Sequence, residues 1–342
     1  RDTDRSRGLG DVYKRQELSI PLYRQEKEWE ALGLRLSRAT MSNWLLVVYR
    51  DWLVHIVHRL KLELLKQRYL HIDETHVQVL KEPGRKNTSD SYMWVYCSIR
   101  DAVNPIRYFE YQPGRSGKYP EAFLREYEGY IHTDAYSGYN AVSGVKRCLC
   151  YTHLRRAFVD ALPKDIHNSE ASKPAEAILR LNQLFNIESE LEALPPDQKK
   201  KERLIREKPL LEAFWSWAEK SAIGELPKSK LSKAFHYALN NREGFWNYLE
   251  DGNCSISNSL AENCIRPFVI GRKNWLFSGS PKGAEASAGI YTLVETAKAN
   301  GLAPMKYIKY ILSDMPGSAF LEHPEYLDDY LPWNPLVKEF CR

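Results

Sequence analysis

The chain has 342 residues, of which 43% are hydrophobic and 27% charged, and this is an ordinary globular composition. Its net charge of +5 permits an anionic partner without requiring one. No apolar run reaches the roughly 18 residues of a membrane-spanning helix, so no membrane partner is expected. Six cysteines without the spacing of a small disulfide-rich domain favour a reducing compartment, and a cytoplasmic location is expected.

The first residues, Arg1–Gln16, do not resemble native sequence. Residues 11–16 back-translate to an oligonucleotide that is similar to a sequencing-library adapter. We therefore predict that Arg1–Gln16 is a non-native scar and exclude it from the fold prediction. The natural N-terminus, with any domain it carries, would then lie outside this sequence.

Two short helices are predicted next, at 22–32 and 38–49, with Gly33 as the C-cap of the first. Ser37 is a candidate N-cap for the second helix. Such a pair is typical of a helix-turn-helix DNA-binding motif, although an ordinary helical hairpin has the same pattern. An amphipathic helix is predicted to follow over 51–66.

The stretch Tyr69–Thr75 alternates apolar and polar residues, which predicts a strand with one buried face. Asp73 lies near its end, and Asp134 ends a second short strand of the same design, residues 130–134. Either acid alone is explained as a solvated residue at a strand end. The repeated design favours a metal-binding pair, because a strand holds a carboxylate more rigidly than a loop does.

Further strands are predicted at 93–99, 106–111 and 146–151, with a helix at 120–127. The order is strand–strand–strand–helix–strand–strand, and the two acids lie on the first and fourth strands. This is the order of a ribonuclease-H-like core, although periodicity alone predicts only a mixed α/β fold.

A helical insertion is predicted over residues 170–250. Glu, Lys, Leu and Ala dominate there, and prolines interrupt the pattern at Pro195, Pro196 and Pro227. A helix over 153–162 is expected to precede the insertion.

A later helix, Asn258–Ile270, is predicted from apolar residues that recur in two adjacent rows at a spacing of four. Asn258, Glu262 and Arg266 form a polar row on the other side, so Glu262 is expected to project away from the packed face. Pro267 is expected to kink or end this helix, because it lacks an N–H group and crowds the preceding turn.

Two more helices are predicted at 283–300 and 304–313, with Gly301 between them. The tail from Met315 is rich in proline and is expected to be irregular.

Asp73, Asp134 and Glu262 are a candidate catalytic and metal-binding triad. Mg²⁺ prefers oxygen ligands and keeps several waters, so few carboxylates suffice. Two such ions about 3.5 to 4 Å apart activate an attacking oxygen and stabilise a leaving oxygen in phosphoryl displacement. Spacing alone supports this choice weakly, because 44 acidic residues offer many triples.

Six longer motifs resemble those of bacterial DDE transposases of the insertion-sequence sixty-six type. They are His71–Thr75, His132–Tyr139, Cys150–Arg156, Asn258–Gly279, Glu295–Gly301 and Leu331–Asn334. The resemblance runs from about Pro21 to the end of the chain. Full-length members usually carry a further N-terminal segment with a zinc-binding motif, which is expected to be missing here by truncation.

The resemblance implies a ribonuclease-H-like mixed sheet interrupted by a helical insertion, with helix-turn-helix-like helices before it and a helical segment after it. It implies that Asp73, Asp134 and Glu262 bind two Mg²⁺ ions, for which Mn²⁺ can substitute. A 3′-hydroxyl freed at the element end then attacks target DNA. The implied partners are terminal inverted repeats, target DNA and further copies of the chain, as a homodimer or larger assembly in the nucleoid.

The expected division of the chain follows from the same resemblance. It comprises a scar (1–16), a helical DNA-binding segment (17–66), the first part of the core (67–165), the insertion (166–252), the last part of the core (253–300), and a C-terminal helix and tail (301–342).

Cys150 and His153 form a Cys-x-x-His signature, for which the resemblance implies a role in positioning DNA or the catalytic strand. With Cys148 they could begin a zinc site, but zinc takes four ligands and no second Cys/His pair lies close in sequence. The alternative is a buried, reduced cysteine beside a helix-capping histidine. Asn258 is expected to support the same site.

Several side chains are candidates for DNA contacts. Phosphate contacts, which position DNA without reading its sequence, are expected from Arg155, Arg156, Arg266, Arg272 and Lys273. Trp275 or Tyr136 could stack on an unpaired base, although a single aromatic residue is more often part of the core than of a contact surface.

Three functions remain open from the sequence. The first is a transposase that cleaves element ends and transfers strands. The second is a ribonuclease-H-like nuclease or resolvase, which shares the triad but needs no terminal repeat. The third is an inactive helix-turn-helix DNA-binding fragment. Cleavage of DNA that carries terminal repeats, compared with cleavage of unrelated duplex, separates the three.

Overall fold

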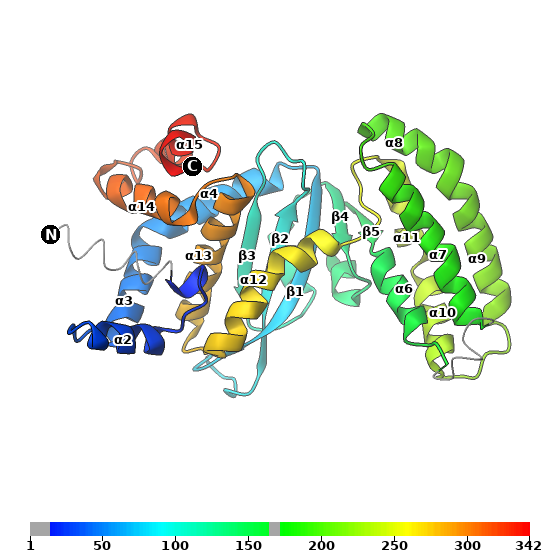
Figure 1. Cartoon of the computed structure of the whole chain (residues 1–342), viewed down its shortest axis with the longest axis horizontal. Helices are drawn as coiled ribbons and strands as arrows, with labels where there is room; N and C mark the ends of the chain where they lie inside the picture. Colours follow the sequence, from blue (N-terminus) through cyan, green and yellow to red (C-terminus); the bar gives the residue numbers. More distant parts are fainter. Residues whose placement is uncertain (1–13, 164–171) are drawn as a thin grey trace. The chain divides into compact units, whose positions relative to one another are not determined.

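The computed structural model describes residues 14–163 and 172–342 (Figure 1). The chain divides into two compact units, each of which is described by itself. Unit 1 comprises residues 1–127 and 260–342, and unit 2 comprises residues 128–259. Most of the expected scar, residues 1–13, and the expected boundary at 165/166 lie outside the described residues.

Unit 1 contains an antiparallel sheet in the order β3-β2-β1, formed by β1 (Tyr69–Val79), β2 (Asp90–Ser98) and β3 (Arg107–Gln112). A two-residue strand, β6 (Phe277–Ser278), pairs in parallel with the end of β1. The three predicted strands are confirmed, and β1 continues four residues beyond the predicted stretch. Each side of this sheet therefore carries alternate residues of β1.

The register separates two neighbouring acids of β1. Asp73 lies opposite Val95 of β2, and residues directly opposite each other in antiparallel strands share a face. The face that bears Asp73 therefore also carries Val95 and Phe109, which belong to a buried apolar cluster. Glu74 lies on the other face.

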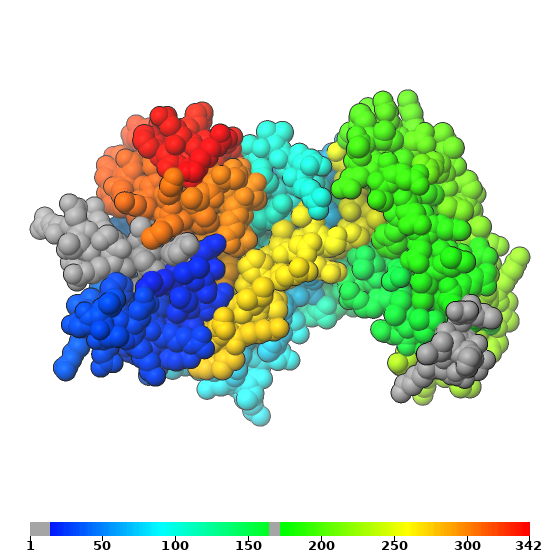
Figure 2. All heavy atoms as spheres, in the orientation of Figure 1, coloured from blue at the N-terminus to red at the C-terminus, as the bar shows by residue number. Residues whose placement is uncertain are grey.

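Helix α12 (Ser259–Trp275) and helix α13 (Pro281–Ala299) cover the face that bears Asp73 (Figure 1). Ala261, Ile265 and Phe268 of α12 are buried in the apolar cluster against this face. The outer side of α12 lies at the surface of unit 1 (Figure 2). Pro267 was expected to kink or end this helix. The helix does not end there, because it continues through Pro267 to Trp275. Packing of residues on both sides of the proline compensates for the lost backbone hydrogen bond.

The N-terminal helices of unit 1 are α2 (Leu22–Ala31) and α3 (Arg38–Val48). The predicted turn and cap are confirmed, since Gly33 has φ +81° and the Ser37 hydroxyl accepts a hydrogen bond from the Thr40 N–H at 3.1 Å. The second predicted helix does not end near residue 49. It continues through a π-helical segment (Tyr49–Leu53) into α4 (Val54–Leu65).

Helix α13 also fixes the edge of the sheet. The Thr292 hydroxyl accepts the Phe109 N–H at 2.8 Å, and the Thr296 hydroxyl accepts the Arg107 N–H at 3.1 Å. β3 is the edge strand of this sheet, and these bonds occupy two of its N–H groups, which are then not available to pair with a further strand.

The C-terminal part of unit 1 is more regular than predicted. Helix α14 (Pro304–Asp314) agrees with the prediction, but the tail also contains 3₁₀ turns and α15 (Pro335–Cys341). The Ala303 N–H donates to the Cys341 carbonyl at 2.7 Å, and the Tyr307 hydroxyl donates to the Tyr330 carbonyl at 2.7 Å. These long-range bonds order a segment whose prolines had suggested irregular structure.

Unit 2 contains two parallel strands and a group of helices. The strands are β4 (Gly129–Thr133) and β5 (Val145–Leu149), and α5 (Lys118–Phe123) of unit 1 precedes them in the chain. A 3₁₀ turn (Ser137–Ala141) lies between the two strands. After β5 come α6 (Tyr151–Val159), α7 (Lys173–Glu190), α8 (Pro196–Glu202), a π-helical segment (Arg203–Glu207), α9 (Lys208–Ala222), α10 (Lys230–Asn240), α11 (Arg242–Trp246) and a 3₁₀ turn (Asn247–Glu250). Helices thus dominate the segment predicted to be a helical insertion. Together the units form a mixed α/β protein, as the sequence predicts.

No helix within the described residues is both long enough and apolar enough to cross a membrane.

A buried arginine joins the helices of unit 2 to the segment that precedes α12. Arg203 is fully buried, and its guanidinium forms a two-point ion pair with Glu188 of α7. The same guanidinium donates to the backbone carbonyls of Tyr248, Asp251 and Cys254 at 3.1, 3.1 and 2.8 Å. All of these partners are needed, because an incompletely bonded buried charge is strongly destabilising.

Glu207 lies beside this ion pair and accepts a hydrogen bond from the Tyr248 hydroxyl at 2.6 Å. Burial raises the pKa of Glu207 to about 8, and the negative charge of Glu188 adds to the effect. The carboxyl of Glu207 is therefore protonated in the folded protein at neutral pH.

We predict that Glu207→Gln stabilises unit 2 in a pH-dependent manner. The unfolded carboxyl titrates near 4.5 and the folded one near 8, so the unfolded state loses its proton first and stability falls as pH rises between these values. The variant cannot ionise. Its free energy of unfolding should match the parent near pH 4 and exceed it by about 2–4 kcal/mol at pH 8.5, by urea titration.

Glu212→Gln, at an exposed position of α9, is the matched control and should change the free energy of unfolding by less than about 0.5 kcal/mol at either pH. Equal behaviour of the two variants would contradict the assignment of a neutral Glu207.

We further predict that Phe268→Ala destabilises unit 1 by about 3–5 kcal/mol, because it leaves a cavity between α12 and the sheet. Phe268 is fully buried, and its ring lies 5.3 Å from that of Trp275 and 5.4 Å from that of Tyr291. Ile270→Ala on the same helix removes a side chain that is 51% exposed and should cost little. Chemical denaturation, monitored by tryptophan fluorescence, measures the free energy of unfolding of both variants. Similar losses of stability in the two variants would show that α12 is not anchored through Phe268.

Candidate active site

Asp73 of unit 1 is half-buried on the sheet face that α12 covers. One of its carboxylate oxygens accepts the Glu74 N–H at 2.9 Å, which fixes the side chain against the strand. Glu74 has a different role. Its side chain is 2% exposed on the other face and forms an ion pair with Arg115 at 2.6 Å. Of the two adjacent acids, Asp73 is the one on the α12 side.

Glu262 lies on the first turns of α12, and its direction follows from its neighbours. Ala261 and Ile265 face the sheet, and Cys264 packs against the cluster that contains Cys97 of β2, close enough for each thiol to shift the pKa of the other. At about 100° per residue, Glu262 projects from the flank of α12 opposite to Cys264. Since the Cys264 flank lies over β2, the Glu262 flank is on the β1 side.

Asp73 is also close to the thiol of Cys97. Burial raises the pKa of Cys97, and its hydrogen bond with Cys264 and the charge of Asp73 act in the same direction. Asp73 and α12 therefore lie on the same face of the unit 1 sheet. The structure thus brings two of the three predicted carboxylates, Asp73 and Glu262, to one side of one sheet.

The predicted cations of α12 lie along this region. Arg266 and Lys273 are exposed and follow Glu262 by four and eleven residues, so they project from the same flank. Arg272 turns toward the sheet, where its guanidinium donates to the Thr75 hydroxyl at 3.1 Å. Thr75 shares a face with Asp73, two residues away. Burial lowers the pKa of Arg272, but a guanidinium keeps its charge.

Trp275 is a correction to the sequence analysis. Its side chain is 8% exposed and packs in the apolar cluster, and the Arg15 guanidinium lies 5.1 Å from its ring. It is therefore a core residue and offers no open ring on which a base could stack. The sequence around Trp275 places cations beside aromatics, and this pattern does not indicate which of these side chains are buried.

Asp134 belongs to unit 2 and follows β4 directly. One of its carboxylate oxygens accepts the Tyr136 N–H at 2.9 Å. Arg147 of β5 holds the same turn, because its guanidinium donates to the carbonyls of Asp134 and Tyr136 at 2.7 and 2.8 Å and to the Thr133 hydroxyl at 2.7 Å. The sequence analysis missed Arg147, whose role depends on the pairing of β4 with β5.

The ring of Tyr136 packs over Gly138 within the same turn. A Cβ at Gly138 would lie 2.2 Å from this ring, so glycine is required for the close approach. Tyr136 is half-buried, and its ring centroid lies 6.0 Å from that of Tyr139. The turn that carries Asp134 is therefore held by side-chain packing as well as by Arg147.

Cys150 and His153 lie at the start of α6, and the predicted supporting residue Asn258 contacts Cys150. Burial opposes ionisation of the Cys150 thiol, but hydrogen bonds from His153 and from the Asn258 N–H, at 3.1 Å, outweigh it and lower its pKa. Asn258 is 1% exposed, so this contact is in the interior of unit 2.

Tyr237 of α10 is a further residue that the sequence analysis missed. Burial raises the pKa of its phenol, and the charges of Asp134 and Cys150 act in the same direction. The helical segment therefore contributes a hydroxyl near the predicted acid of unit 2. A single tyrosine in an amphipathic helix gave no signal of this proximity.

Of the two predicted arginines on α6, Arg156 is exposed, whereas Arg155 donates to the Asn182 side chain of α7 at 2.7 Å. Arg156 is thus the more accessible of the pair for a phosphate contact.

A different cysteine–histidine group occurs in unit 2. Ligand atoms of His132, Cys148 and Cys254 lie within 4.8 Å of one another, and all three residues are buried. The structure thus groups Cys148 with these residues rather than with the Cys150 signature. Zinc usually has four ligands, and the Nε2 of His132 already accepts the Ser255 N–H at 2.9 Å. This bond occupies one ring nitrogen and disfavours a metal.

Comparison with known proteins is consistent with these features. Three proteins of Sinorhizobium fredii, all named as uncharacterized, are similar to 92% of this chain: y4qI at 28% identity, y4hP at 27% and y4jD at 26%. The chain spans 59% of the length of the first two and 63% of the third. The family model described as "Transposase IS66 family" matches residues 12–286, which include Asp73, Asp134 and Glu262. The chain therefore belongs to the IS66 family of transposases.

Proposed function

We propose that this chain is the catalytic part of a DNA transposase that cleaves the ends of an insertion element and joins them to target DNA. The observation that carries the proposal is the placement of Asp73 and Glu262 on the same side of the unit 1 sheet, in a chain of a transposase family. The proposal extends to a ribonuclease-H-like topology for the core, with the helices after α6 as an insertion.

Asp73, Asp134 and Glu262 are proposed to hold two Mg²⁺ ions, with Mn²⁺ as a substitute. The donor set fits the ion, because carboxylate oxygens are the ligands that Mg²⁺ prefers and Asp73 is only half-buried. When bound, the metals would activate the attacking oxygen and stabilise the leaving oxygen. The chain itself needs no nucleophilic side chain, since water or a DNA 3′-hydroxyl attacks.

The side chains around the acids have supporting roles in this proposal. Arg266 and Lys273 would contact phosphates beside the cleaved bond, and Arg156 would do the same from unit 2. Arg147 would keep Asp134 in position through the turn that follows β4. Synapsis of two element ends favours a homodimer or larger assembly on DNA, in the cytoplasm and associated with the nucleoid.

The test of the triad is cleavage of DNA that carries the element's terminal inverted repeats, with Mg²⁺ present. Asp73→Asn, Asp134→Asn and Glu262→Gln should each reduce end cleavage by at least about 10³-fold, because each removes a proposed metal ligand. Asp160→Asn, at an exposed position of α6's C-terminal end, is the control and should retain activity. Circular dichroism checks that each variant is folded.

The same assay separates the alternative functions. Cleavage of unrelated duplex at an equal rate would replace the transposase proposal by a nuclease without end specificity. DNA binding without any cleavage would favour an inactive DNA-binding fragment. Activity that survives in Glu262→Gln would remove Glu262 from the site.

A second prediction concerns DNA affinity. Arg266→Ala and Lys273→Ala should each weaken binding to all DNA sequences and reduce the slope of log affinity against log salt by about 1, because each removes one phosphate contact. Fluorescence anisotropy at several salt concentrations measures the slope. Lys220→Ala, at an exposed position of α9, is the control, and an unchanged slope in Arg266→Ala would exclude that side chain from the interface.

A further inference from the structure

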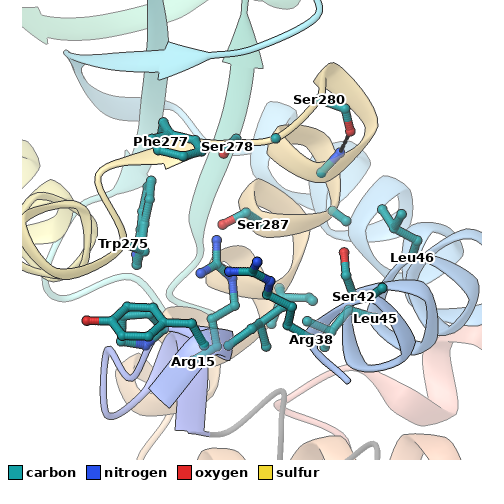
Figure 3. A pocket seen from close by; sticks show the side chains of 18 of the residues that line it. Arg15, Arg38, Ser42, Leu45, Leu46, Trp275, Phe277, Ser278, Ser280 and Ser287 are labelled. Carbon is teal, nitrogen blue, oxygen red and sulfur yellow. Dashed lines mark hydrogen bonds between the residues drawn. The ribbon is translucent and has the colours of Figure 1, made fainter. Parts of the chain in front are cut away.

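A cavity of about 580 Å³ lies in unit 1 (Figure 3). Helices α2 and α3 form one side of it, and the segment from Trp275 into the first turns of α13 forms the other. A small-molecule group of nucleotide size fits this volume. No residue of the triad lines the cavity, so it is separate from the proposed active site.

The charge of the cavity wall has a single sign. Three cationic side chains line it, those of Arg15, Arg38 and Lys81, and no Asp or Glu is among the described residues of the lining. Within the described part of the chain, none of these three cations forms an ion pair. Figure 3 shows the Arg15 and Arg38 side chains directed into the same space. Such a concentration of unpaired positive charge favours an anion.

A buried hydroxyl points into the same space. Ser287 of α13 is 3% exposed, and its Oγ has no hydrogen-bond partner among the described residues. Figure 3 shows this oxygen directed into the cavity. A buried polar group without a partner costs free energy, and a ligand oxygen at this position would remove that cost.

The N-terminus of α13 supplies a third anion-binding feature. This helix has 19 residues, and Ser280 caps it by accepting the Gly283 N–H at 3.2 Å. Ser280 and Gly283 both line the cavity, so the positive end of the helix dipole lies at its wall. Pro281 has no N–H group and the Gly283 N–H is bonded to Ser280, so the helix contributes its dipole rather than a set of free amides. Arginine side chains donate to phosphate through two parallel N–H groups.

We propose that this cavity binds a phosphate group of a DNA strand, which Arg38, Lys81, Ser287 and the N-terminus of α13 hold. The choice of DNA as the source of the phosphate rests on the proposed function, whereas the anion site itself does not. Such a contact positions DNA without reading its sequence. Arg15 adds charge in this chain, but the site is not assigned to it, because it lies in the segment predicted to be non-native.

The test is isothermal titration calorimetry, in which inorganic phosphate is added to the purified full chain and its dissociation constant is measured. Arg38→Ala should weaken phosphate binding at least tenfold, and Ser287→Ala should weaken it severalfold. Arg35→Ala removes an exposed arginine that does not line the cavity and should leave the affinity unchanged. Arg15→Ala should weaken binding less than Arg38→Ala does. Melting temperatures establish that all variants are folded.

A competition experiment identifies the source of the phosphate. If the site holds DNA, duplex DNA should displace inorganic phosphate, and Arg38→Ala should weaken DNA binding as well. If phosphate binds and DNA fails to displace it, the assignment to DNA is overturned. Equal phosphate affinities of Arg38→Ala and Arg35→Ala would overturn the site altogether. Neither readout depends on cleavage, so failure of the proposed function would be seen separately, in the triad variants.

Discussion

The contact between α12 and the sheet of unit 1 is the interaction on which the proposed chemistry depends. Phe268 and its apolar neighbours seat the helix on the face formed by alternate residues of β1, β2 and β3. This contact fixes the rotation of the helix and hence the flank from which Glu262 projects. It also carries the helix through Pro267, where the backbone alone favours a break. A carboxylate 189 residues from Asp73 in the chain is thus brought to the side of the sheet that bears Asp73.

In unit 2, two arginines perform the comparable task by hydrogen bonding. Arg147 connects β5 to the turn that carries Asp134, and Arg203 connects α7 to the segment that leads to α12. Each donates to two or more backbone carbonyls at a place where the chain leaves regular structure and the helix and sheet ladders supply no donor. The neutral Glu207 beside Arg203 follows from the same burial, since two ionised carboxylates at one guanidinium would repel each other.

Two groups of cations in unit 1 support the proposed contact with nucleic acid. The net charge of the chain, +5, is modest, but Arg266 and Lys273 share a flank with Glu262. Among the described residues, the lining of the cavity beside α13 has cations and no acid. The two sites differ in construction. The α12 cations are exposed and suited to a strand that passes over the surface. The cavity adds a buried hydroxyl and a helix N-terminus, and we propose that these hold a single phosphate group.

Local periodicity, turn chemistry and motifs were enough to predict the succession of strands along the chain, the cap at Ser37, the turn at Gly33 and the family of the chain. Only the tertiary structure decided which side chains are buried. It put Trp275 into the core, paired Glu74 with Arg115, and placed Tyr237 near Asp134. These outcomes depend on contacts between segments that are far apart in the chain, and a local sequence pattern contains no information about such contacts.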